Sequence, residues 1–169
     1  MQQQDWHFSL ELQSHTLRDF DPLLLLQHLF VHSRELEAHK EALYTVLAEL
    51  YFNALDHGIL QLDSALKHDV KGFADYYELR EGLLNNLTEG YIQFSLQHIS
   101  TPAGGDLIIE VCDSGSGFDY ATYMNKAVNK TSPTTTYSGR GISLIRALCR
   151  ELTYLEPGNK VRVLYQWNY

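Results

Sequence analysis

Three polar side chains, those of Glu49, Asn53 and His57, are spaced four residues apart in the segment LAELYFNALDHGI. On an α-helix this spacing places a carboxylate, an amide and an imidazole in one row along the helix surface. The row lies at the edge of the apolar stripe of the same segment, and such groups are costly to bury unless they meet polar partners or a ligand. The row is therefore a candidate binding site, although it is also typical of a solvated helix edge whose histidine favours the helix dipole.

Two glycine-rich loops further along the chain have the chemistry to hold a ligand. In D-S-G-S-G-F-D, which starts at Asp113 after an apolar stretch, a carboxylate can accept hydrogen bonds while the glycine backbone approaches a ligand closely. In S-G-R-G-I, which starts at Ser138 and precedes a predicted helix, glycines flank free N–H groups that can bind phosphate. Each loop taken alone is also compatible with an ordinary turn.

The hydrophobic pattern predicts the elements that position these residues in the first half of the chain. Residues 6–14 alternate apolar and polar side chains, which predicts a strand. Asp21 and Pro22 then form an N-cap and a first turn, which predicts the start of a helix. A second helix is expected over about 35–57, with Gly58 at the position where a C′ glycine would end it.

The second half of the chain has a different order of elements. It is predicted to contain a helix over about 73–88 broken by glycines, strands over 91–99 and 107–113, a polar mobile segment over 119–138, a helix over 141–152, and a hairpin over 153–167. The whole order predicts an α+β fold, a two-layer sandwich with helices on a mainly antiparallel sheet. Because no repeat or linker interrupts it, we expect a single domain over 1–169.

Composition and charge argue against several classes of function. The chain has 169 residues, 44% hydrophobic and 20% charged, which predicts a globular protein. Its net charge of -8 and its scattered basic residues argue against a nucleic-acid or membrane-surface binder, since such proteins cluster Lys and Arg. Cys112 and Cys149 lie in apolar stretches and lack metal-ligand spacing, which favours two buried, reduced thiols. The start of the chain lacks signal-peptide features, and no apolar run is long enough to span a bilayer, so we expect a cytoplasmic protein.

Taken together, the three patterns resemble the motifs of the GHKL ATPase superfamily, which has the Bergerat fold. The order E-x-x-x-N-A-x-x-H-G, then D-x-G-x-G, then G-x-G before a helix is similar to its N-box, G1 and G2 motifs. The resemblance covers about residues 6–168 and agrees with the predicted order of elements. It implies a site for ATP and Mg²⁺.

The resemblance also implies a role for each residue of the site. Asn53 would coordinate the Mg²⁺ that bridges the phosphates, since an amide oxygen suits a hard cation, and Glu49 would act as general base. Asp113 would accept a hydrogen bond from the adenine amino group. The other ATP-binding residues that it implies are His57, Gly115, Gly117, Gly139, Arg140 and Gly141, with residues 119–138 as the ATP lid. The role of Arg140, a contact to the γ-phosphate, is inferred from its position only.

Within the superfamily the sequence is most similar to bacterial anti-sigma-factor serine/threonine kinases. Sensor histidine kinases usually carry asparagine at the position of Glu49 and have an aromatic-rich F-box, which is not visible here. His28 lacks the sequence context of a phosphoacceptor histidine. Topoisomerase- and chaperone-type ATPases have the glutamate but continue into a transducer domain, whereas this chain ends at Tyr169.

This resemblance implies a kinase that phosphorylates a serine or threonine of an anti-anti-sigma (STAS-type) protein, and it leaves open a bound sigma factor and a homodimer. Neither nucleic acid nor a membrane is an expected partner. The segment 59–90 is longer than in the compact kinases and is similar to kinase-like domains that follow a receiver and a phosphatase domain in larger regulators. Three alternatives remain: a partner-binding module gated by nucleotide without phosphoryl transfer, the ATP-binding domain of a histidine kinase, and a plain ATPase.

Overall fold

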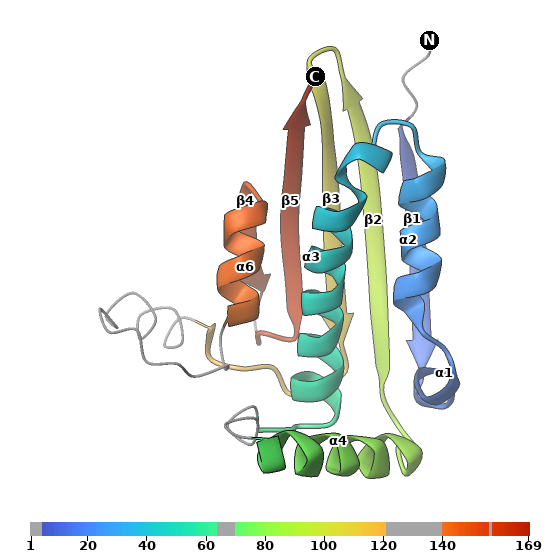
Figure 1. Ribbon diagram of the computed structural model, residues 1–169, viewed down its shortest axis with the longest axis vertical. Helices are drawn as coiled ribbons and strands as arrows, with labels where there is room; N and C mark the ends of the chain where they lie inside the picture. The colour runs from blue at the N-terminus through green and yellow to red at the C-terminus, as the bar shows by residue number, and fades with distance from the viewer. Residues whose placement is uncertain (1–4, 64–69, 121–139, 156) are drawn as a thin grey trace, which may run out of the picture.

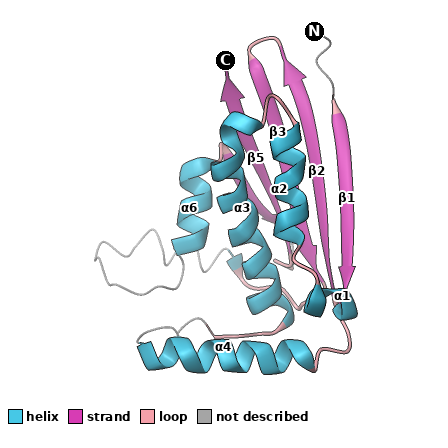
Figure 2. Cartoon of the chain, turned by 45° about the vertical axis from the view of Figure 1, so that its right-hand side comes forward, coloured by secondary structure: helices cyan, strands magenta, loops and turns pink. Residues whose placement is uncertain are grey.

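A single antiparallel sheet with helices packed on one of its faces forms the frame of the protein (Figures 1 and 2). The computed structural model describes residues 5–63, 70–120, 140–155 and 157–169. The five strands of the sheet run in the order β1-β2-β3-β5-β4. Their bounds are β1 Trp6–Gln13, β2 Tyr91–Thr101, β3 Gly104–Asp113, β4 Glu151–Leu155 and β5 Lys160–Asn168. The predicted α+β fold is confirmed.

The helices lie on one side of the sheet, with α3 in the middle and α2 and α6 beside it (Figure 1). The described helices are α1 Ser14–Asp19, α2 Pro22–His32, the 3₁₀ turn η1 Glu37–His39, α3 Lys40–Phe52, the π-helical turn η2 Asn53–Ile59, α4 Val70–Asn85 and α6 Arg140–Leu148. In the views of Figures 1 and 2, α4 runs across the end of the molecule at which α3 stops. None of these helices is long and apolar enough to cross a bilayer.

The core lies between this helical layer and the sheet. Along β2, Phe94 and Leu96 point into the core while Gln93 and Gln97 are exposed on the opposite face, as expected of a sheet covered on one side. Fully buried side chains of the core include Leu26, Phe30, Leu43, Val46, Leu47, Leu50, Ile109 and Val163. Asp21 caps α2 as predicted, because its carboxylate accepts a hydrogen bond from Leu23 N–H at 2.9 Å.

The prediction that Gly58 ends the second helix is wrong. The α-helical part starts at Lys40, after the η1 turn, and the helix continues past Phe52 as the wider turn η2. Leu60 N–H donates to the carbonyl of Leu55, five residues earlier, which is the π-helical pattern. Gly58 lies inside this turn, where the carboxylate of a distant residue occupies the space that a Cβ would need.

Two further predictions about the helices are wrong, and one helix is not predicted. Helix α4 is continuous through Gly72 and Gly82 and is not broken by its glycines. Helix α6 ends at Leu148, earlier than predicted, because Arg150 N–H donates to Leu164 O and the chain enters the sheet as β4. Helix α1 is not predicted by the sequence at all. Most of the expected mobile segment, residues 121–139, lies outside the described residues.

The two thiols differ in burial. Both are free, as expected; Cys149 is buried, whereas Cys112 is only half-buried at the end of β3.

Candidate functional site

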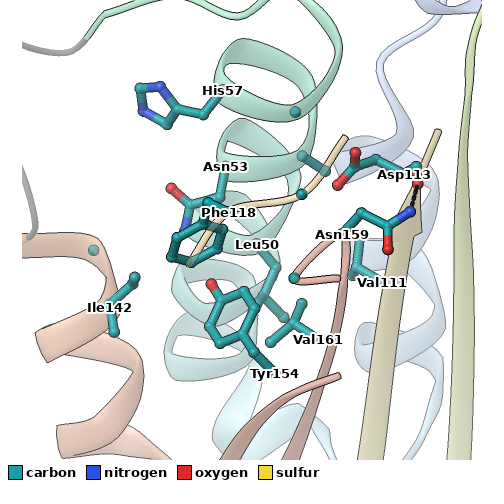
Figure 3. Close-up of a pocket in the computed structure, with 15 residues that line it drawn as sticks. Leu50, Asn53, His57, Val111, Asp113, Phe118, Ile142, Tyr154, Asn159 and Val161 are labelled. Carbon is teal, nitrogen blue, oxygen red and sulfur yellow. Dashed lines mark hydrogen bonds between the residues drawn. The ribbon is translucent and has the colours of Figure 1, made fainter. Parts of the chain in front are cut away.

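A cavity of about 280 Å³ lies where η2, the end of β3 and the first turn of α6 meet (Figure 3). Its apolar wall includes Leu50, Val111, Ile142 and Val161. Small-molecule sites are typically concave and mostly apolar, with a few polar groups that fix the orientation of the ligand. Five of the predicted site residues line this cavity: Asn53, His57, Asp113, Gly117 and Gly141.

The other predicted site residues have different positions. Glu49 is half-buried next to the cavity, one helical turn before Asn53, and Gly115 packs behind Asp113. The backbone of Arg140 begins α6, and its side chain is outside what the structure describes. Gly139 lies outside the described residues, so its predicted role is not tested.

Asp113 is held rigidly by its own main chain at the end of β3. Its N–H donates to Asn159 O at 2.9 Å, and its carbonyl accepts a hydrogen bond from Asn159 Nδ2 at 2.7 Å (Figure 3). The side-chain Oδ1 accepts a hydrogen bond from Gly115 N–H at 2.8 Å. Because Ile92 pairs with Asp113 across β2 and β3, the carboxylate sits at a fixed point of the sheet.

Glycines make room for this carboxylate on two sides. A Cβ added at Gly58 would lie 2.5 Å from Asp113 Oδ1, 2.6 Å from its Cγ and 2.8 Å from its Oδ2. A Cβ added at Gly115 would lie 2.7 Å from the same Oδ1 and would overlap the carbonyl oxygen of Gly58. The end of the helix and the first glycine loop are therefore in direct contact through the carboxylate.

A second pair of glycines joins the same loop to the turn between β4 and β5. Gly117 has φ 76° and Gly158 has φ 100°, a backbone region that favours glycine. A Cβ at Gly117 would overlap Pro157 O, and one at Gly158 would overlap Phe118 O. This close approach places the β4–β5 turn in the wall of the cavity, opposite η2.

Burial governs the electrostatics of Asp113. Asp113 is only 7% exposed, so its carboxyl group loses most of its contact with water. This desolvation raises the pKa of the carboxyl to about 6, although the hydrogen bond from Gly115 opposes the shift. Its two oxygens still have acceptor capacity beyond that one bond. A buried carboxylate of this kind is suited to accept a hydrogen bond from an amino group of a ligand.

The raised pKa of Asp113 predicts that the charge destabilises the ligand-free fold. The pKa is raised from 3.8 to about 6 on folding, so the folded state binds more protons between these values, and stability falls as pH rises through them. We expect Asp113→Asn to raise the free energy of unfolding by about 1–3 kcal/mol above pH 6.5, since one pKa unit corresponds to 1.36 kcal/mol. The gain should shrink toward pH 4.

Denaturant unfolding of the ligand-free protein at pH 4.5, 6 and 8 measures this effect. The control is Asp19→Asn, which changes an exposed aspartate at the end of α1. A variant of Asp113 that is less stable than the wild type at pH 8 would show that hydrogen bonds to the charged carboxylate outweigh its desolvation, which contradicts the prediction.

Asn53 carries an amide whose hydrogen bonds are incomplete. The residue is the first of η2, and its side chain lies on the cavity side of the helix, across from Ile142 in α6 (Figure 3). Its Nδ2 is buried and has no hydrogen-bond partner among the described residues. Buried polar groups of folded proteins are nearly always paired, so this amide fits a site whose ligand completes its polar contacts. A Mg-nucleotide meets that need, because Nδ2 can donate a hydrogen bond to a phosphate oxygen while the amide oxygen binds the cation.

Glu49 lies against the first turn of α6. A Cβ added at Gly141 would overlap the Oε2 of Glu49 and lie 3.1 Å from its Cδ. The free N–H groups of a helix N-terminus favour negative charge. The carboxylate and the predicted phosphate site are therefore neighbours, and only the absence of a side chain at Gly141 permits this.

The imidazole of His57 is oriented by the loop that follows η2. Its Nδ1 lies 2.7 Å from Leu62 O, so that nitrogen carries the proton and donates to the carbonyl. Nε2 is then the nitrogen available to a ligand. The ring is exposed at the open side of the cavity (Figure 3).

Sequence reasoning missed an aromatic wall on the sheet side of the cavity. Phe118 and Tyr154 line the cavity with their ring centres 5.0 Å apart, and the ring of Tyr120, which is not a lining residue, packs on Tyr154 at 4.4 Å. Tyr154 lies in β4, and β4 reaches the first glycine loop only because it pairs with β5 in the sheet. The sequence places Asn159 only within the predicted hairpin over 153–167. No local pattern signals either residue, because their place in the cavity depends on the pairing of β4 and β5.

Comparison with known proteins gives one family match. The model of the family described as "Histidine kinase-like ATPase domain" matches residues 31–165, a range that contains every residue of the cavity. No curated protein matches the chain closely enough to count as a relative.

Proposed function

We propose a function for this chain, which belongs to the histidine kinase-like ATPase family: it binds Mg-ATP in the cavity beside η2 and transfers the γ-phosphoryl group to a serine or threonine of a partner protein. The observation that carries the proposal is the convergence of Asn53, Asp113 and the first turn of α6 on one cavity. The family implies ATP binding; the acceptor and the partner are inferred from the sequence resemblance.

The two ends of the cavity have different chemistry and suggest the orientation of the nucleotide. At one end, the buried carboxylate of Asp113 would accept a hydrogen bond from the adenine amino group. At the other end, the N-terminus of α6 at Gly141 would receive the phosphates. The apolar wall between these ends excludes water from the base and sugar.

Asn53 lies between these two ends and would hold the magnesium ion. The bound cation would neutralise phosphate charge and orient the γ-phosphoryl group for in-line attack. Nδ2 of Asn53 has no hydrogen-bond partner among the described residues, and this supports a nucleotide here, since Nδ2 could donate to a phosphate oxygen while the amide oxygen holds the cation. Nε2 of His57, on the next turn, can meet the solvent side of the same phosphates.

Glu49 is the proposed general base. Its carboxylate would accept the proton of the serine or threonine hydroxyl as the hydroxyl oxygen forms its bond to the γ-phosphorus, while the bond to the β–γ bridging oxygen breaks and ADP leaves. The position of Glu49 against Gly141 supports this role, since a base must lie within reach of the phosphate end. Glutamate at this position is also the residue that favours a hydroxyl acceptor in the family resemblance.

The proposed partner is an anti-anti-sigma protein of the STAS type, and a sigma factor is a second proposed partner. Both come from the similarity of the N-box to that of anti-sigma-factor kinases. Each alternative function predicts a different result in a phosphorylation assay.

Incubating the protein with such a partner and γ-labelled Mg-ATP tests the proposal. We expect an acid-stable phosphoserine or phosphothreonine on the partner. Acid-labile phosphate would favour the histidine kinase alternative, and partner binding that needs ATP but transfers no label would favour the gated binding module. ATP turnover that is the same with and without the partner would indicate a plain ATPase.

A further inference from the structure

The cavity is formed in part by η2, and η2 contains a buried carboxylate that does not line the cavity. Asp56 is only 4% exposed and lies between Asn53 and His57 in the sequence. Both of its oxygens accept hydrogen bonds from α4: Oδ2 from the hydroxyl of Tyr76 at 2.8 Å, and Oδ1 from Nε of Arg80 at 2.7 Å. A buried carboxylate requires such partners, and the loss of one leaves charge that is not compensated.

Helix α4 presents these two partners from one face. Tyr76 and Arg80 are four residues apart, so they point in the same direction from the helix. Tyr76 is fully buried, and the guanidinium of Arg80 also lies 5.8 Å from the ring centre of Phe52, the last residue of α3. The contact between Arg80 and Phe52 holds α4 against the end of α3, where η2 begins (Figures 1 and 2). Most other residues in the middle of α4 are exposed.

A π-helical turn needs support from outside itself. Its i→i+5 hydrogen bonds are less favourable than those of an α-helix, and such turns occur mostly where function requires them. Asp56 is the fourth residue of η2, and Asn53, Ala54, His57 and Gly58 on the other side of the turn line the cavity. The hydrogen bonds to Asp56 therefore hold the turn in place from the side that faces away from the cavity.

We propose that Asp56, Tyr76 and Arg80 are positioning residues that hold η2 in the geometry at which Asn53 reaches the phosphate end of the nucleotide. The inference rests on the proposed nucleotide site and deepens it. This network of three residues affects the part of the binding free energy that comes from Mg²⁺ and the phosphates. It acts less on the adenine end, because Asp113 is fixed by the main chain of β3 and by Asn159.

Titration calorimetry with Mg-ATP and with adenosine tests this difference. We expect Tyr76→Phe to weaken Mg-ATP binding about 10-fold, as is common for partners that orient a metal ligand, and to leave adenosine binding nearly unchanged. Tyr77→Phe is the matched control, since it removes one hydroxyl from the neighbouring residue, which is 57% exposed. Arg80→Lys keeps the charge and should retain more Mg-ATP affinity than Arg80→Gln, which provides a second measurement if Tyr76→Phe folds poorly.

A double-mutant cycle with Asn53→Ala separates positioning from general destabilisation. If the network acts through Asn53, Tyr76→Phe should have little further effect on Mg-ATP binding once Asn53 is alanine. Additive losses, equal losses of adenosine and Mg-ATP, or unchanged Mg-ATP binding in both the Tyr76 and Arg80 variants would overturn the proposal. A wild-type protein that binds neither ligand would overturn the nucleotide site itself, whatever the variants do.

Discussion

Replacing Gly58 by alanine is expected to weaken adenosine and Mg-ATP binding by about 10- to 100-fold, the equivalent of one lost hydrogen bond to a charged group. The added methyl would lie 2.5–2.8 Å from three atoms of the Asp113 carboxyl group, which is closer than real Cβ contacts. Asp113 cannot shift with its backbone, because hydrogen bonds to Asn159 fix that backbone. The carboxylate must rotate away from the position at which it would meet adenine.

The control for this variant is Gly82→Ala. Gly82 lies in α4, and a Cβ there meets nothing within 4 Å. Alanine is the better helix former by about 0.5–1 kcal/mol, so this variant should bind nucleotide normally and be slightly more stable. Both ligands are titrated calorimetrically against both variants. Normal adenosine affinity in Gly58→Ala would mean that the base does not contact Asp113.

Replacing Glu49 by glutamine is expected to lower the rate of phosphoryl transfer to the partner about 10²- to 10⁴-fold, the usual contribution of a general base. The amide cannot take the hydroxyl proton, yet it has nearly the same shape and can still pack against Gly141. Mg-ATP affinity should therefore stay close to that of the wild type. Single-turnover labelling of the partner at saturating ATP measures the chemical step.

The matched control for Glu49 is Glu41→Gln, which neutralises an exposed glutamate in the first turn of the same helix. It should phosphorylate the partner at the wild-type rate. If Glu49→Gln does the same, Glu49 is not the base, and the argument for a hydroxyl acceptor loses its main support. A variant of Glu49 that also loses ATP would instead place this carboxylate in nucleotide binding.

Local sequence signals predicted much of the fold. Alternation over 6–14, the Asp21 N-cap and the change of period at residue 91 all correspond to elements of the structure. Each depends on neighbours within a few residues, which a single sequence displays directly. The spacing of Glu49 and Asn53 also holds, since both lie within α-helical geometry and Asn53 N–H donates to Glu49 O.

The part of the site that the sequence does not predict depends on tertiary contacts. The sequence pattern predicts a helix stop at Gly58, whereas the role of this glycine depends on a carboxylate that is distant in the sequence. Asp56 has no local signal, because its partners Tyr76 and Arg80 lie in α4, 20 and 24 residues further along the chain. Tyr154 joins the cavity only through strand pairing. A sequence displays the residues that touch a ligand more readily than the contacts that hold those residues in place.

The proposed kinase activity requires nucleotide binding in this cavity. Calorimetric titration of the wild type with Mg-ATP and Mg-ADP, beside the same titrations of Asn53→Ala, tests it most directly. We predict saturable binding of both nucleotides at one site per chain, weakened about 10- to 100-fold in Asn53→Ala because the proposed magnesium ligand is lost. No binding to the wild type, or equal binding to both proteins, would contradict the proposed site.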